Sequence, residues 1–111
     1  MKSPFITYRS NRLFIEDAAA EKLAERFGTP LYVYSRGAVE AAFHSYQYAF
    51  SRLTHLVCYS LKANSNLAVA ATLARNGCGA DIVSGGELRR ALLAGFDPHH
   101  IIFSGVGKTK D

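Results

Sequence analysis

The chain has 111 residues, of which 49% are apolar and 20% are charged, and its formal net charge is +4. This composition is ordinary for a globular protein. No apolar run approaches the roughly 20 residues that a membrane-spanning helix needs. Residues 1–20 lack the basic start, apolar middle and cleavage site of a signal peptide. We therefore expect a cytoplasmic protein with no membrane partner.

The basic residues are scattered along the chain, and only Arg89 and Arg90 are adjacent. Nucleic-acid surfaces need clustered basic side chains, so we expect no nucleic-acid partner. The cysteines, Cys58 and Cys78, have no ligand spacing with each other or with the histidines. We expect two reduced cysteines and no metal site.

In chain order, the first predicted element is a helix from about Asp17, which ends at Gly28. Four short apolar runs follow, and each is expected to form a strand: Leu31–Tyr34, Leu56–Leu61, Ala80–Val83 and Ile101–Ser104.

Helix-period stretches separate these runs. The longest apolar face consists of Val39, Phe43, Tyr46, Phe50 and Leu53. The expected N-caps are Ser35, Ser65 or Asn66, and Ser84, and the expected stops are Gly77 and Gly95.

Strands that alternate with helices in short units predict a parallel sheet. Both an open doubly wound sheet and an eight-stranded barrel are built this way, and periodicity does not choose between them. A complete barrel needs about 250 residues, so a barrel would be only half present. The chain stops in a polar loop at Asp111. We therefore expect a piece of a longer protein.

The segment Ser104–Thr109 is similar to the end of a phosphate-binding P-loop. That motif requires a glycine where Ile102 stands, and the loop is too short to wrap a triphosphate. A nucleotidase is therefore disfavoured.

Lys62 follows the apolar run Leu56–Leu61 directly and precedes a predicted helix start. In barrel enzymes the catalytic groups lie at the C-terminal ends of strands. A partly desolvated lysine favours its neutral form, which attacks aldehydes to form Schiff bases. Spacing alone, however, favours an ordinary surface lysine.

Three polar residues lie on the next strand–helix unit. Asp81 is a carboxylate in an otherwise apolar run, and either Lys62 is its partner or it is solvated at an edge. Ser84 and Glu87 have the spacing of a capping box, which is the favoured role of Glu87 from the pattern alone. The intervening Gly85 and Gly86 would let a ligand approach the backbone.

These segments resemble the alanine-racemase-like barrel decarboxylases, the ornithine, diaminopimelate and arginine decarboxylase family. Its lysine segment is similar to Tyr59–Asn64, its next two blocks to Gly79–Ala91 and Ile101–Thr109, and its first strand to Gly28–Ser35. Leu13-x-x-Glu16 is similar to the preceding stretch. Ser60-Leu61 departs from the more usual Ala-Val.

The resemblance implies an α/β fold, the first half of a pyridoxal-phosphate-binding (β/α)8 TIM-type barrel. It implies pyridoxal 5'-phosphate as cofactor and Lys62 as the catalytic lysine that binds it. Asp81, Ser84 and Glu87 would also contact the cofactor pocket. Residues 1–29 would form an N-terminal strand and helix packed with a second β domain, and residues 30–111 the incomplete barrel.

The implied substrate is a small amino acid. The blocks are closest to the members that convert meso-2,6-diaminopimelate to L-lysine, the last step of lysine biosynthesis. Family members that act on arginine, ornithine or carboxynorspermidine remain alternatives, as does a non-catalytic regulatory relative. A homodimer is expected for the complete enzyme. The phosphate loop, the acidic partner of the ring nitrogen, a ring-stacking histidine and a cysteine from the second subunit are expected beyond this chain, which we therefore expect to be inactive alone.

Overall fold

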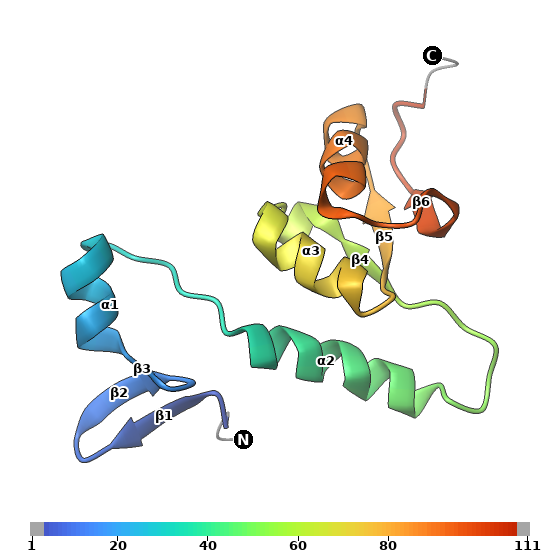
Figure 1. The fold of residues 1–111 in the computed structure, drawn as a ribbon. Coiled ribbons are helices and arrows are strands. Elements are labelled where there is room, and N and C mark those ends of the chain that lie inside the picture. The colour runs from blue at the N-terminus through green and yellow to red at the C-terminus, as the bar shows by residue number, and fades with distance from the viewer. Residues whose placement is uncertain (1–3, 109–111) are drawn as a thin grey trace. The chain divides into compact units, whose positions relative to one another are not determined.

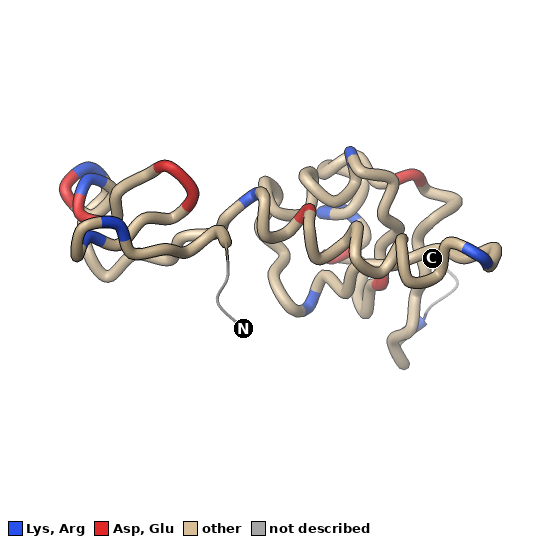
Figure 2. Tube along the Cα trace, turned by 90° about the horizontal axis from the view of Figure 1, so that it is seen from below, with Lys and Arg blue, Asp and Glu red and all other residues tan. Residues whose placement is uncertain are grey.

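The computed structural model describes residues 4–108, and these form two compact units, Met1–Ala38 and Val39–Asp111. None of the helices in the described part is long and apolar enough to cross a membrane. Figure 2 shows Lys and Arg, in blue, and Asp and Glu, in red, scattered along the trace.

The N-terminal unit is an antiparallel sheet followed by a helix (Figure 1). Its strands are β1 (Ile6–Arg9), β2 (Arg12–Ile15) and β3 (Ala18–Ala19), and its helix is α1 (Ala20–Phe27). The turn between β1 and β2 has positive φ at Ser10 (48°) and Asn11 (61°), as type I′ hairpins require. The sequence pattern missed this hairpin, and α1 begins later than predicted because β3 first pairs with β2.

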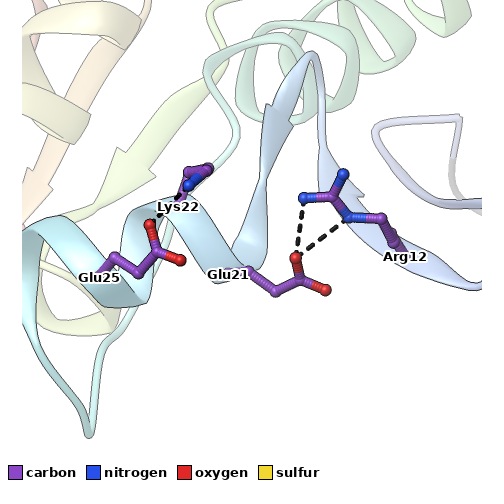
Figure 3. A network of polar contacts seen from close by, with 4 residues as sticks. All are labelled: Arg12, Glu21, Lys22 and Glu25. Carbon is purple, nitrogen blue, oxygen red and sulfur yellow. Dashed lines mark hydrogen bonds and ion pairs between the residues drawn. The ribbon is translucent and has the colours of Figure 1, made fainter.

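Exposed side chains of this unit form ion pairs (Figure 3). Arg12 on β2 donates from Nε and Nη2 to Oε2 of Glu21 on α1, at 3.1 and 2.8 Å. Within α1, Lys22 Nζ lies 2.8 Å from Glu25 Oε2. Pairs this exposed contribute about 0–1 kcal/mol each, so packing and backbone hydrogen bonds dominate the stability of the unit.

The segment 31–34 is not a strand, which contradicts the prediction for Leu31–Tyr34. All four side chains are exposed, Tyr32 to 88%, and no ladder forms there among residues 4–108. A local apolar pattern indicates that a segment can pair, but a strand requires a partner for its N–H and C=O groups.

The helix α2 (Arg36–Ala49) begins where Ser35 was predicted to cap it. Ser35 Oγ accepts a hydrogen bond from the Ala38 N–H at 2.9 Å. The carboxylate of Glu16 adds a second cap, since its Oε1 accepts from Ser35 Oγ at 2.6 Å and from the Gly37 N–H at 2.8 Å. The predicted apolar face continued past the observed helix end, and of its members only Phe43 is buried.

The second unit carries a parallel sheet with strands in sequence order. Its strands are β4 (Cys58–Ser60), β5 (Gly79–Ile82) and β6 (Ile101–Phe103). Single 3-10 turns occupy Leu61–Ala63 and Pro98–His100. Each new strand adds to the same edge, as in a barrel.

Two helices connect these strands, α3 (Leu67–Arg75) and α4 (Gly85–Ala94). The predicted caps are confirmed: Asn66 accepts from the Ala68 N–H, Ser84 accepts from the Glu87 N–H, and Gly95 ends α4 with φ of 89°. Of the two N-cap candidates for α3, the structure selects Asn66.

The core lies on one face of this sheet. Ala80 and Ile82 of β5 are buried there with residues of α3 and α4, and Tyr59, Ile101 and Phe103 pack against the same cluster. Because side chains alternate across a strand, the opposite face of the sheet carries the residues between them. It is on that face that polar side chains gather.

Candidate active site

Three polar side chains form a hydrogen-bonded row across the sheet. Ser60 on β4 and Asp81 on β5 are register partners, so their side chains lie on the same face. Ser60 Oγ donates to Asp81 Oδ2 at 2.9 Å. From the other side, the hydroxyl of Ser104, which follows β6, donates to Asp81 Oδ1. Both carboxylate oxygens of Asp81 are therefore occupied, each by a different neighbouring strand.

Lys62 lies in the 3-10 turn that follows β4 directly, two residues after Ser60. Its position at the C-terminal end of a strand confirms the sequence-based placement. The structure corrects one expectation, because Lys62 is exposed rather than partly desolvated in this chain. The residues described here cover only its strand side.

Asp81 is held as an anion by its neighbours. Its pKa is lowered by the hydrogen bond from Ser104 first, then by that from Ser60, and also by the positive charge of Lys62. No ion pair joins Lys62 and Asp81 among residues 4–108. The sequence left two possibilities for Asp81, a pair with Lys62 or a solvated carboxylate. In the structure Lys62 acts on Asp81 only through space, and the direct contacts come from two serines.

Glu87 and Ser84 are confirmed as a capping pair at the start of α4. Ser84 Oγ accepts from the Glu87 N–H at 3.2 Å, and Glu87 Oε2 accepts from the Val83 N–H at 2.8 Å. The standard capping box would place the glutamate on the N–H of the cap residue itself, and here it reaches one residue further back. Glu87 thereby ties the end of β5 to α4.

Sequence reasoning did not find Ser60 and Ser104 as site residues. Ser60 was noted only as a departure from a family pattern, and Ser104 only as part of a failed P-loop. Their roles depend on the register of β4, β5 and β6, which a single sequence does not specify. The one available signal was position, since both stand at the C-terminal ends of predicted strands.

The two cysteines are free thiols. Among the described residues no group of His, Cys, Asp and Glu could hold a metal ion. Burial raises the pKa of Cys78 to about 11, so it is a thiol at neutral pH. Burial also raises the pKa of Cys58, with a smaller contribution from the Asp81 charge.

Consecutive parallel strands joined by helices define an α/β protein, and Lys62 directly after β4 has the position of a catalytic residue in barrel enzymes. The family model described as "Pyridoxal-dependent decarboxylase, pyridoxal binding domain" matches residues 36–111, and the chain belongs to this family. The predicted α/β fold, the first part of a pyridoxal-phosphate-binding barrel, is therefore confirmed.

Two diaminopimelate decarboxylases are similar to this chain over nearly its whole length. A diaminopimelate decarboxylase of Pseudomonas aeruginosa is 56% identical over 105 residues, which cover 95% of this chain and 25% of that protein. One from Aquifex aeolicus is 47% identical over 108 residues, 97% of this chain and 25% of that protein. The chain therefore spans about a quarter of the length of these relatives.

A solved structure is also similar. Diaminopimelate decarboxylase from M. jannaschii in co-complex with L-lysine is 42% identical, with a TM-score of 0.92. The alignment covers 96% of this chain and 26% of that chain.

The residues present fit pyridoxal phosphate, the cofactor of this family. The group binds through its aldehyde to a primary amine, and Lys62 offers an exposed one. On the neighbouring strand, the Asp81 carboxylate already accepts from two hydroxyls, so it is not an unpaired charge. The start of α4 is also open, because a Cβ added at Gly85 would meet nothing within 4 Å.

Proposed function

We propose that this chain supplies the lysine-bearing part of an enzyme that decarboxylates meso-2,6-diaminopimelate to L-lysine with pyridoxal 5'-phosphate. The observation that carries the proposal is the likeness, over nearly the whole chain, to diaminopimelate decarboxylases. The enzyme would be a cytoplasmic homodimer acting on a small amino-acid substrate. Residues 1–29 would belong with a second domain and residues 30–111 with the barrel.

Lys62 would hold the cofactor covalently in the resting enzyme and release it when the substrate amine takes its place. Bound pyridoxal phosphate supplies the electron sink that stabilises the carbanion left by the departing carboxylate. Asp81, whose carboxylate accepts from two hydroxyls, would line the pocket beside Lys62. Ser84, Glu87 and the glycines between them would shape the pocket wall, with Glu87 fixing the loop between β5 and α4.

The proposal is tested with the full-length protein that contains this chain. We expect release of carbon dioxide from meso-2,6-diaminopimelate, and a loss of about a thousandfold or more in Lys62→Ala, because the group that binds the cofactor is missing. Borohydride reduction should attach a pyridoxyl group to Lys62, located by peptide mass spectrometry. The control is Lys22→Ala, which removes another exposed lysine, on α1, and should leave the activity unchanged.

Three results would contradict parts of this proposal. Pyridoxyl attachment at another lysine would remove Lys62 from its role. Turnover of arginine, ornithine or carboxynorspermidine in place of diaminopimelate would indicate a sister enzyme. Cofactor binding without any amino-acid turnover would indicate a non-catalytic relative.

A further inference from the structure

The serine–aspartate–serine row begins at Ser60, two residues before Lys62, and crosses the sheet from β4 to the end of β6. Ser60, Asp81 and Ser104 lie on the sheet face opposite the core, at the C-terminal ends of three neighbouring strands. Ile102, the register partner of Asp81 on β6, is 52% exposed on this face. The row is therefore not part of the helix-covered core, where a buried polar network would serve packing alone.

The two hydroxyls restrain Asp81 in a particular way. Each donates to a different oxygen of the carboxylate, so rotation of Asp81 toward Lys62 would break at least one hydrogen bond. The positive charge of Lys62 helps to lower the pKa of Asp81, yet the two form no ion pair among residues 4–108. A carboxylate without these donors would be free to pair with the ammonium form of Lys62.

Few other titratable groups face Asp81. On the β4 side these are Lys62 and Cys58, and the thiol form of Cys58 is favoured by burial. The strand β6 carries no titratable residue. On α4, the carboxylate of Glu87 is engaged by the Val83 N–H. Among residues 4–108, Lys62 is the cation whose charge acts on Asp81, whereas Lys108, after β6, lies over the Phe103 ring.

We propose that Ser60 and Ser104 are positioning residues that keep the Asp81 carboxylate off Lys62, so that the lysine amine stays available as a nucleophile. A direct ion pair would stabilise the ammonium form, and only the neutral amine attacks an aldehyde. The hydroxyls therefore set how readily Lys62 takes up the cofactor at a given pH. This inference rests on the proposed role of Lys62 as the cofactor lysine.

The test is the rate at which full-length apoenzyme takes up pyridoxal phosphate, followed by visible absorption across a pH series. This rate should rise with pH as the Lys62 amine loses its proton. In the Ser60→Ala/Ser104→Ala double variant the rise should move to higher pH by roughly 0.5–1 unit, with uptake about three- to tenfold slower near neutral pH. Ser60→Thr keeps a hydroxyl on the same strand and should behave like the wild type.

Two further arms separate positioning from a merely structural role. In an Asp81→Asn background there is no anion to release, so adding the two serine substitutions should move the pH dependence no further. Ser45→Ala removes a serine hydroxyl that donates to the Ala42 carbonyl in α2, and it should leave uptake unchanged. Should the double variant fail to fold, each single variant should show a smaller shift in the same direction.

The outcomes are distinct. Uptake at Lys62 with an unshifted pH dependence in the serine variants would overturn this inference and leave the proposed function intact. The same shift in the Asp81→Asn background would also overturn it, because the effect would not pass through the carboxylate. Uptake at another lysine, or none, would overturn both proposals.

Discussion

Gly79 is a position where one added methyl group should damage both the sheet and the site. It is the first residue of the central strand β5, and its N–H donates to the Val57 carbonyl at 2.9 Å. A Cβ built there would lie 2.6 Å from the carbonyl oxygen of His100 and 2.7 Å from Cys58 Sγ. Both distances are shorter than carbon makes with oxygen or sulfur without repulsion.

The stability cost of Gly79→Ala depends on which of the two crowding atoms can move away from the new Cβ. A side chain can rotate away, but the His100 carbonyl belongs to the backbone just before β6, so β5 and β6 must separate. Overpacking of this kind costs typically about 1–3 kcal/mol. The gain from replacing a strand glycine offsets roughly 0.5–1 kcal/mol of it. Because the clash involves backbone, we expect a net loss of about 2 kcal/mol and a displaced Asp81 two residues on.

The assay is urea unfolding of the full-length protein, read as the midpoint of the transition that includes this unit. Gly85→Ala is the matched control, since its Cβ would meet nothing within 4 Å and it stands at the start of α4. Equal midpoints for the two variants would refute the reasoning. Adding Cys58→Ala to Gly79→Ala should restore only part of the loss, and complete recovery would show that the His100 carbonyl is not the obstacle.

Two further predictions concern stability. Leu61 is fully buried, so Leu61→Ala should lower the free energy of unfolding by about 2–5 kcal/mol, whereas Leu61→Met should cost less than about 1.5 kcal/mol in the same urea titration. The pKa of Glu16 is lowered by the hydrogen bond from Ser35 first and then by that from Gly37. The Glu16 carboxylate therefore contributes to the stability of the fold at pH values above the ordinary carboxylate pKa. This contribution is lost as the pH falls through the lowered pKa. Glu16→Gln should therefore destabilise the protein at neutral pH and converge with the wild type in acid; an equal difference at both pH values would contradict this assignment.

The elements that sequence predicted well are those with local causes. The starts of α2 and α4 follow from Ser35 and Ser84, whose hydroxyls satisfy N–H groups three residues on, and the end of α4 follows from Gly95. These devices act within one turn, so the local sequence contains all the information they need.

The elements that sequence predicted poorly depend on distant partners. The segment 31–34 has a strand's composition but no ladder, and the β1–β2 hairpin turns on Ser10-Asn11 rather than on the common Asn-Gly pair. In the site, Lys62 and Asp81 were identified by residue type and strand position. The hydrogen bonds of Asp81 were not, because they depend on which residues face each other across three strands.

The cap on α2 has a consequence for the order in which the chain can fold. Ser35 caps the first turn locally, but the hydrogen bonds to Glu16 join residues 19 and 21 positions apart, so they require closure of a loop of that length. Closing such a loop costs entropy that the local Ser35 cap does not face. The helix can therefore begin with its Ser35 cap and gain the Glu16 contacts later. These contacts thus report whether the N-terminal hairpin has formed.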